Sequence, residues 1–223
     1  MSQILSDFPC FGSKVDSSVK LFFKNFELPA LARICGFCKI KRFPCVEILF
    51  FMIECIFTGK NLSEIDANGS LPCNRSTYYR FLANPNFNWR RLLLMFALKI
   101  RIIFMNLSDS PDKTDVLIVD DTLYERRRSK KVELLSRKHD HNKNYSVLGF
   151  EMLTIGWSDG RSFLPLIFSL LSSQLVKHRL CEANTSFDRR TIAGKLRSEA
   201  VSGKPTVLLS LLATLKSAGV KTS

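Results

Sequence analysis

The hydrophobic periodicity of this 223-residue chain changes at a polar, proline-containing segment, 108–112. Before this segment, apolar residues recur at steps of three and four, which is typical of amphipathic helices. After it, short continuous apolar runs are typical of buried β-strands. The change predicts an α/β protein in two parts: a helical region over 1–112 and a sheet-containing domain over 113–223.

Spacing and capping signals predict most helices of the first part. Apolar positions indicate helices over 28–35 and 46–57, and a long apolar helix over 89–107. Gly59 is expected to end the second of these helices. A short helix then begins at Asn61, because Glu64 lies three residues on in capping-box register.

A further short helix carries two arginines and two tyrosines, and Asn74 or Ser76 is expected to cap it. With the helix before it, this segment is compatible with a helix-turn-helix in which Arg75, Tyr79 and Arg80 contact DNA. The connection is longer than is usual for that motif. The alternative is an ordinary helical hairpin whose aromatic side chains are core, and the sequence leaves both interpretations open.

Three strands are predicted in the second part. The run 116–119 is apolar throughout, as expected of a central strand buried on both faces. Strands over 152–157 and 162–170 are joined by an Asp-Gly turn signal at 158–160. Pro165 cannot donate to a strand ladder, so it belongs at a sheet edge or at a bulge.

The last predicted element is a helix from Pro205 to a stop near Gly219. One face of this helix is apolar and predicts packing on the sheet. The residues of that face are Val207, Leu208, Leu211, Leu212 and Leu215.

Two carboxylates, Asp120 and Asp121, follow the first predicted strand directly. Carboxylates at a strand end are well placed to hold a hard divalent cation beside a phosphate. Strand alternation sends the two side chains to opposite faces, so only one would point at a given site. The plainer interpretation is a pair of strand-end acids that face solvent or cap a turn.

Lysine and arginine together number 33 against 20 acidic residues, a net charge of +13. Such an excess favours a polyanionic partner, with nucleic acid ahead of an anionic membrane surface. The segment 125–143 alone has eight basic and three acidic residues. We expect Arg126, Arg128, Lys130 and Lys131 to contact phosphate, although solvated surface charge is the usual alternative.

Several other chemistries are not supported. The sequence has no G-x-S-x-G elbow and no glycine-rich phosphate loop. Cys35 and Cys38 lack a second ligand pair at zinc spacing, and the cluster 139–141 (His-Asp-His) is interpreted as a turn rather than a metal site. No apolar stretch has the length and composition of a membrane span, and the N-terminus lacks the order of an export signal.

Several motifs together resemble the DDE transposases of bacterial insertion sequences. In the second part these motifs are VLIVDDTLY at 116–124, RSKKVE at 128–133, GFEMLTIGWSDG at 149–160 and FLPLIFSLLS at 163–172. In the first part, STYYRFL at 76–82 and NPNFNWRR at 84–91 are similar to the helical DNA-binding region of that family. The resemblance covers most of the chain, from about Phe22 onward.

The resemblance implies a ribonuclease-H-like core with a mixed sheet and helices. In that core three acidic residues bind two Mg²⁺ or Mn²⁺ ions, and DNA strands are cut and joined at phosphorus. The first catalytic, metal-binding Asp of the family corresponds to Asp121, with Asp120 as the flanking acid. The implied partner is DNA at the transposon ends, and the implied location is the bacterial cytoplasm in association with the nucleoid.

The sequence also departs from the family. The second catalytic Asp is expected on a strand after the helix that stops near Gly219, and the catalytic Glu later still. Asp140, Asp159 and Asp188 do not occupy that strand position. The chain is therefore expected to be truncated, with an incomplete sheet, an open and aggregation-prone strand edge, and no activity by itself.

Two alternatives to an active transposase remain. One is a non-enzymatic DNA-binding protein that occupies transposon ends, forms a homodimer, or pairs with a full-length transposase and inhibits it. The other is the product of a decayed gene without a role.

Overall fold

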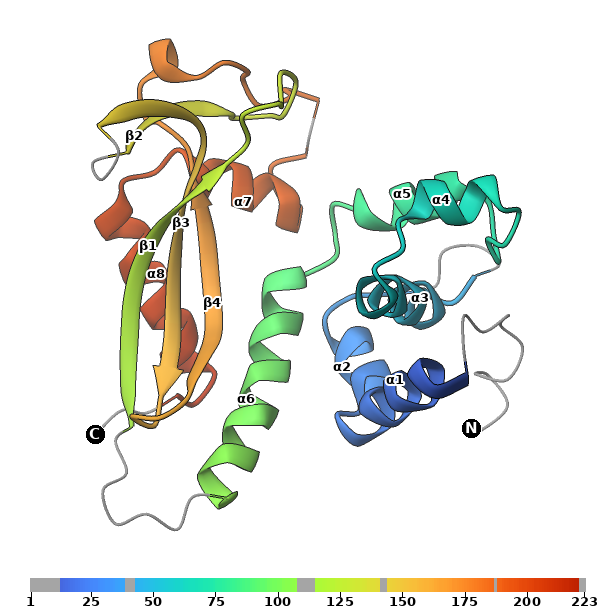
Figure 1. The fold of residues 1–223 in the computed structure, drawn as a ribbon. Helices are drawn as coiled ribbons and strands as arrows, with labels where there is room; N and C mark the ends of the chain where they lie inside the picture. The colour runs from blue at the N-terminus through green and yellow to red at the C-terminus, as the bar shows by residue number, and fades with distance from the viewer. Residues whose placement is uncertain (1–12, 39–42, 108–114, 141–143, 187, 221–223) are drawn as a thin grey trace. The chain divides into compact units, whose positions relative to one another are not determined.

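The structure is a computed structural model that describes residues 13–38, 43–107, 115–140, 144–186 and 188–220. The chain divides into two compact units, Met1–Leu92 and Leu93–Ser223 (Figure 1). The predicted boundary at 112 falls in a segment that lies outside the described residues, so that boundary stays a prediction.

The described part of the first unit is helical, as predicted. Its helices are α1 (Ser13–Asn25), α2 (Leu28–Ile34), α3 (Cys45–Thr58), α4 (Leu62–Ala67), α5 (Arg75–Leu82) and the start of α6 (Trp89–Leu107). The predicted bounds of α6 are confirmed, and those of α2 and α3 are correct to within one residue.

The predicted capping signals of the first unit are confirmed. Gly59 ends α3 in the left-handed conformation, with φ of 68°. The Asn61 side chain accepts from the Glu64 backbone N–H, and the Glu64 side chain accepts from the Asn61 N–H, which completes the capping box of α4. Asn74, the first of the two candidates, caps α5 by accepting from the Ser76 N–H.

Aromatic rings form much of the core of the first unit. Phe37 stacks on Phe87 with ring centroids 4.5 Å apart, and Trp89 packs edge-on against Phe37 at 4.6 Å. Phe81 joins this cluster, while Tyr78 packs against α3. The buried rings of α5 therefore agree with the helical-hairpin interpretation, and they leave the opposite face of the helix free for another role.

The second unit contains a sheet against which helices pack. In its described part, the strands are β1 (Val116–Glu125), β2 (Ser136–Asp140), β3 (Tyr145–Ser158) and β4 (Phe163–Leu171). They are followed by a 3-10 turn (Val176–His178), α7 (Ile192–Ala200) and α8 (Lys204–Ser217). The α/β class predicted from the change of periodicity is confirmed.

Strand β3 is the centre of the described sheet. It pairs with β1 from Gly149 to Ser158, with β2 from Tyr145 to Gly149, and with β4 from Glu151 to Ser158. The predicted hairpin at 158–160 is confirmed, since β3 and β4 flank it. A register shift between Ile155 and Gly156 faces Pro165, which confirms the bulge expected at that proline.

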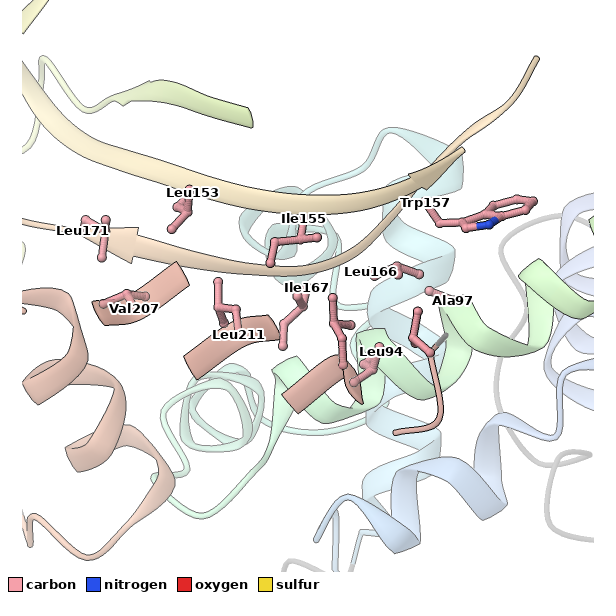
Figure 2. Close-up of a cluster of buried hydrophobic side chains, with 12 residues drawn as sticks. Leu94, Ala97, Leu153, Ile155, Trp157, Leu166, Ile167, Leu171, Val207 and Leu211 are labelled. Atoms are coloured by element: carbon pink, nitrogen blue, oxygen red, sulfur yellow. The ribbon is translucent and has the colours of Figure 1, made fainter. Parts of the chain in front are cut away.

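The core of the second unit lies on one face of β3 and β4 (Figure 2). Leu153, Ile155 and Trp157 alternate along β3 and are fully buried there. Helix α8 packs on this face, as its apolar stripe predicts, and α6 contributes Leu94 and Ala97. This packing fixes the first residues of α8 over the sheet.

Three predictions about the sheet are wrong. Strand β1 continues to Glu125, so Asp120 and Asp121 lie inside the strand rather than at its end. Among the described strands β1 pairs with β3 alone, and its residues are largely exposed, so it is not a central strand buried on both faces. The cluster 139–141 is not a turn, because His139 and Asp140 belong to β2, while His141 lies outside the described residues.

The sheet also differs from the mixed sheet that the resemblance implies. Every pair of strands in the described residues is antiparallel. Short connections such as the turn from β3 to β4 join antiparallel neighbours, whereas parallel neighbours need a longer crossover.

Candidate metal and nucleic-acid site

Asp121 lies in the middle of β1, and the pairing of this strand with β3 determines which face of the sheet its side chain lies on. Its register partner is Leu153, whose side chain is buried under α8. Paired residues share a face of an antiparallel sheet, so Asp121 faces the side on which α8 packs and Asp120 faces the other. Half of the Asp121 side chain remains exposed.

The side chain of Lys204 meets the Asp121 carboxylate from above the sheet. Lys204 is the first residue of α8, and its Nζ donates to Asp121 Oδ2 at 2.5 Å. The same ammonium group contacts Glu151 Oε1. Glu151 lies on β3, two residues before Leu153, so the ammonium group joins β1, β3 and α8.

Glu151 is held from a second side. Lys138 of β2 places its Nζ 3.5 Å from Glu151 Oε2, and it also donates to the backbone oxygen of Ser172 at 3.1 Å. Two lysines from different elements therefore compensate one carboxylate. No local sequence signal marks Glu151, Lys204 or Lys138, because their proximity depends on strand register and on where α8 begins.

The contacts between Lys204 and the two carboxylates shift the pKa values of Asp121 and Lys204. The hydrogen bond from Lys204 holds the pKa of the Asp121 carboxyl below its ordinary value, although partial burial acts in the opposite direction. In return, hydrogen bonds to Asp121 and then Glu151 raise the pKa of the Lys204 ammonium group. Asp121 and Lys204 are therefore both charged at neutral pH.

The carboxylate oxygens of Asp121 and Glu151 are suitable ligands for a hard divalent cation. Carboxylate oxygens are the ligands that Mg²⁺ and Mn²⁺ prefer, and Asp121 and Glu151 already converge on one positive charge. In the part of the chain that the structure describes, no group of three or more His, Cys, Asp or Glu side chains could hold a metal ion. The described site thus offers two carboxylates, one predicted and one not.

A basic segment, residues 126–131, follows β1 directly. The side chains of Arg126, Arg128, Lys130 and Lys131 are exposed, as a phosphate-binding role requires. The guanidinium of Arg126 lies over the Tyr124 ring, 5.1 Å from its centroid.

Arg127 belongs to the same segment but differs from its neighbours. Its Nε lies 2.5 Å from Glu125 Oε2, and its Nη2 donates to Tyr145 Oη at 2.7 Å. These bonds raise the pKa of the guanidinium above its ordinary value, the hydrogen bond to Glu125 contributing most. The charge of Arg127 is compensated within the protein, so this residue offers a natural control for its neighbours.

The candidate DNA-contacting residues of the first unit lie on the exposed face of α5. Arg75, Tyr79 and Arg80 are exposed, whereas Tyr78 and Phe81 are buried. Arg75 lies over the Tyr79 ring at 5.7 Å and is 3.5 Å from Asp66, while Arg80 Nε donates to the Ser76 backbone oxygen at 3.3 Å. Helix α5 thus has both a core face and a cationic, aromatic outer face.

None of the described helices has the length and apolar character that a membrane crossing needs.

Together, the antiparallel sheet, the helices that pack on it and the acidic residue on β1 are consistent with a DDE nuclease fold. The family described as DDE superfamily endonuclease matches the chain over residues 47–223, and the chain belongs to this family. The resemblance seen in the sequence motifs is thereby confirmed. Endonucleases of this superfamily act on DNA and generally use divalent metal ions. No curated protein and no solved structure matches the chain.

Proposed function

We propose that the chain is part of an insertion-sequence transposase, in which Asp121 is a ligand of catalytic Mg²⁺ or Mn²⁺. The observation that carries this proposal is the location of Asp121. It lies inside the region matched by the endonuclease family, on an exposed strand, and its carboxylate is paired with the Lys204 ammonium group. A divalent ion at this position would supply activation of water or a 3′-hydroxyl and stabilisation of the leaving oxygen.

The residues of the chain have separable roles in this proposal. Asp121 holds the metal, and the basic segment holds the phosphodiester backbone through Arg126, Arg128, Lys130 and Lys131. At the rise of an extended strand, Arg126 lies roughly 16 Å along the chain from Asp121. One bound duplex spans that distance, so a single DNA molecule can contact both places.

We also propose that the outer face of α5 contacts DNA at the transposon ends through Arg75, Tyr79 and Arg80. The support is the division of α5 into a buried aromatic face and an exposed cationic face. Contacts of this kind add affinity by releasing counterions from the DNA backbone.

A second candidate function is DNA binding without catalysis, either as a homodimer or in a pair with a complete transposase that it inhibits. The observation that favours it is the carboxylate count: the described residues bring two acidic side chains to Lys204, whereas the resemblance implies three around two metals. On this reasoning we expect the 223-residue chain, assayed alone, to bind DNA without cutting it.

A single-turnover cleavage assay with Mg²⁺, run beside a binding assay on the same duplex, separates the two functions. Binding without cleavage supports the non-catalytic role for this chain. Cleavage that disappears in Asp121→Asn would instead establish catalysis by the chain itself. Absence of DNA binding would contradict both.

The salt dependence of binding tests the basic segment. Arg128→Gln removes an exposed cation, so the slope of log affinity against log salt should fall by about 0.9, the value for one phosphate contact on duplex DNA. Arg127→Gln is the matched control, and a much smaller change is expected because Glu125 and Tyr145 already engage that guanidinium. Equal slopes for both variants and the parent would assign the segment to solvated surface.

A further inference from the structure

We propose that Lys204 is a positioning residue that acts as a built-in counter-ion of the Asp121 site. Its ammonium group occupies the place between Asp121 and Glu151 that a divalent cation would take. The divalent cation binds by displacing this ammonium group. This inference rests on the proposed role of Asp121 as a metal ligand. It adds two residues, Lys204 and Glu151, and an order of events.

The geometry places the ammonium group where a ligand would sit. Lys204 Nζ reaches Asp121 Oδ2 on β1 and Glu151 Oε1 on β3 at the same time. A second cation close to both oxygens would meet strong like-charge repulsion from this group. The two carboxylates therefore cannot both bind a divalent ion while Lys204 keeps its contacts with them.

The backbone of Lys204 is fixed by packing rather than by the ion contacts. Helix α8 begins at Lys204, and its next turn carries Val207, which is buried against the sheet with Leu211 and Leu215. The helix position therefore survives loss of the Lys204 charge. Only the side chain needs to move for the ammonium group to leave the carboxylates, and Lys204 is 43% exposed, so space for that movement exists.

A lysine at this position is unfavourable for the helix itself. The N-terminal end of a helix carries a partial positive charge, which favours acidic side chains in the first turn and disfavours basic ones. The first turn of α8 contains no acidic residue, and its N-cap, Gly203, makes no side-chain cap. The benefit of Lys204 therefore lies in its contacts with Asp121 and Glu151.

Lys138 provides an internal comparison. It also contacts Glu151, through Oε2 at 3.5 Å, but it reaches the site from β2 and bonds the Ser172 backbone. Removal of Lys138 changes the charge near Glu151 and leaves the ammonium group on Asp121. Removal of Lys204 frees Asp121 and leaves Glu151 with Lys138 as its one remaining lysine contact among the described residues.

The test is a titration of the full 223-residue chain with Mn²⁺, followed by paramagnetic broadening of backbone amide NMR signals around Asp121 and Leu153. This readout detects weak binding and reports where the ion binds. In Lys204→Met, which keeps the aliphatic stem, the affinity for Mn²⁺ at this site should rise about tenfold, because one positive charge close to the ion is gone. Lys204→Arg, which keeps the charge, should restore the lower affinity of the parent chain.

Two methionine variants control for net charge. Lys138→Met should raise the affinity by less than about threefold, because Asp121 keeps its counter-ion. Lys216→Met removes an exposed charge from the last turn of the same helix and should leave the affinity unchanged. If Lys204→Met gives no folded protein, Lys204→Gln replaces it in the series.

The outcomes separate this inference from the proposed function. If Asp121→Asn abolishes broadening but Lys204→Met binds Mn²⁺ no more tightly than the parent, the counter-ion role is wrong and the metal role of Asp121 stands. If Asp121→Asn binds as well as the parent, or if no variant shows broadening at this site, the metal assignment itself is wrong and the inference falls with it. If Lys138→Met raises the Mn²⁺ affinity as much as Lys204→Met does, the gain comes from the change in net charge near the site, and the inference is also wrong.

Discussion

Strands β1 and β3 pair residue by residue along the whole of β1, yet they have opposite environments. Ile155 of β3 is 0% exposed, whereas its register partner on β1, Val119, is 46% exposed. Both residues are β-branched and apolar, and both face the same side of the sheet. The difference shows that the neighbours of each strand, more than the hydrophobicity of its sequence, decide which residues become core.

The neighbours of β3 explain its burial. It has β1 on one side, β2 and β4 as further partners, and α6 and α8 against one face. Its end is also anchored by polar contacts, since Trp157 Nε1 donates to Asp115 at 2.5 Å and Arg101 Nη2 donates to the same carboxylate at 2.7 Å. The Arg101 guanidinium lies 5.5 Å from the Trp157 ring centroid, which adds a cation–π contact.

The surroundings of β1 agree with the metal-binding role proposed for Asp121. With β3 as its one strand neighbour in the described residues, β1 keeps the Asp121 carboxylate half exposed and close to Lys204. A carboxylate buried as deeply as Ile155 could not meet a metal ion and DNA from solvent. The same exposure leaves Val116, Ile118 and Val119 open, which is an aggregation liability at a sheet edge.

The largest expected effect follows directly from the pair Ile155 and Val119. Ile155→Ala should lower the free energy of unfolding by about 2–5 kcal/mol, because it removes buried methylene groups and leaves a cavity between β3 and α8. Val119→Ala, at the partner position, should cost less than about 1 kcal/mol, because little of its surface is buried. Urea unfolding followed by circular dichroism measures both values.

An equal loss of unfolding free energy in Ile155→Ala and Val119→Ala would contradict the difference in burial between β3 and β1. It would mean that something covers the face of β1 in solution, as a second copy of the chain would. Repeating the Val119→Ala measurement at several protein concentrations distinguishes these cases, because self-association makes apparent stability depend on concentration.

A smaller effect is expected from two glycines of β3 that face different neighbours. A Cβ at Gly149 would lie 2.3 Å from the backbone oxygen of Tyr124 on β1, and backbone cannot move aside cheaply. Gly149→Ala should therefore cost about 1–3 kcal/mol by forcing β1 away from β3. Gly156→Ala is the control: its Cβ would meet ring atoms of Phe163 at 2.3 Å, an exposed side chain that can rotate, and its nearest backbone atom, the Leu164 oxygen, is farther away at 3.1 Å.

The same unfolding experiment measures both glycine variants. A clearly larger cost at Gly149 than at Gly156 would show that the contact between β1 and β3 contributes to stability despite the exposure of β1. If Gly149→Ala is the milder change, the pairing of β1 is weaker than its register suggests.

Local signals in the sequence predict much of this fold, because they act over a few residues. Capping by Asn61 and Glu64, the glycine stop at Gly59, and the hairpin at 158–160 all depend on neighbouring atoms alone. The apolar face of α8 was predicted for the same reason. Strand β2 has no clear sequence signal, because charged residues interrupt its pattern: the exposed Arg137 and the half-buried Lys138 lie in it.

What the sequence does not predict depends on contacts between distant residues. A continuous apolar run indicates a strand, but only the pairing shows that β1 is exposed and extends past Asp121. Likewise, the motif alone predicts Asp121 as a site residue, whereas Glu151 and Lys204 join it through strand register and through the place where α8 begins. Side chains that converge from three elements leave no signal in local spacing.

The smallest expected effect lies in the turn that follows β3, where Asp159 is held by hydrogen bonds and not by burial. The Asp159 carboxylate accepts from the backbone N–H groups of Ser162 at 2.6 Å and Arg161 at 3.0 Å, and these bonds, that of Ser162 first, hold its pKa below the ordinary value. A carboxyl whose pKa is lower in the folded state stabilises the fold above its unfolded-state pKa, near about 3.9, and this contribution is lost as the pH falls through the folded-state value. Asp159→Asn keeps an oxygen acceptor but removes the charge, so the difference in free energy of unfolding between parent and variant should be small at neutral pH and should vanish at about pH 2. A difference that stays constant over this range would show that the turn depends on hydrogen-bond geometry alone, and that the carboxylate charge at the end of β3 contributes nothing to the fold.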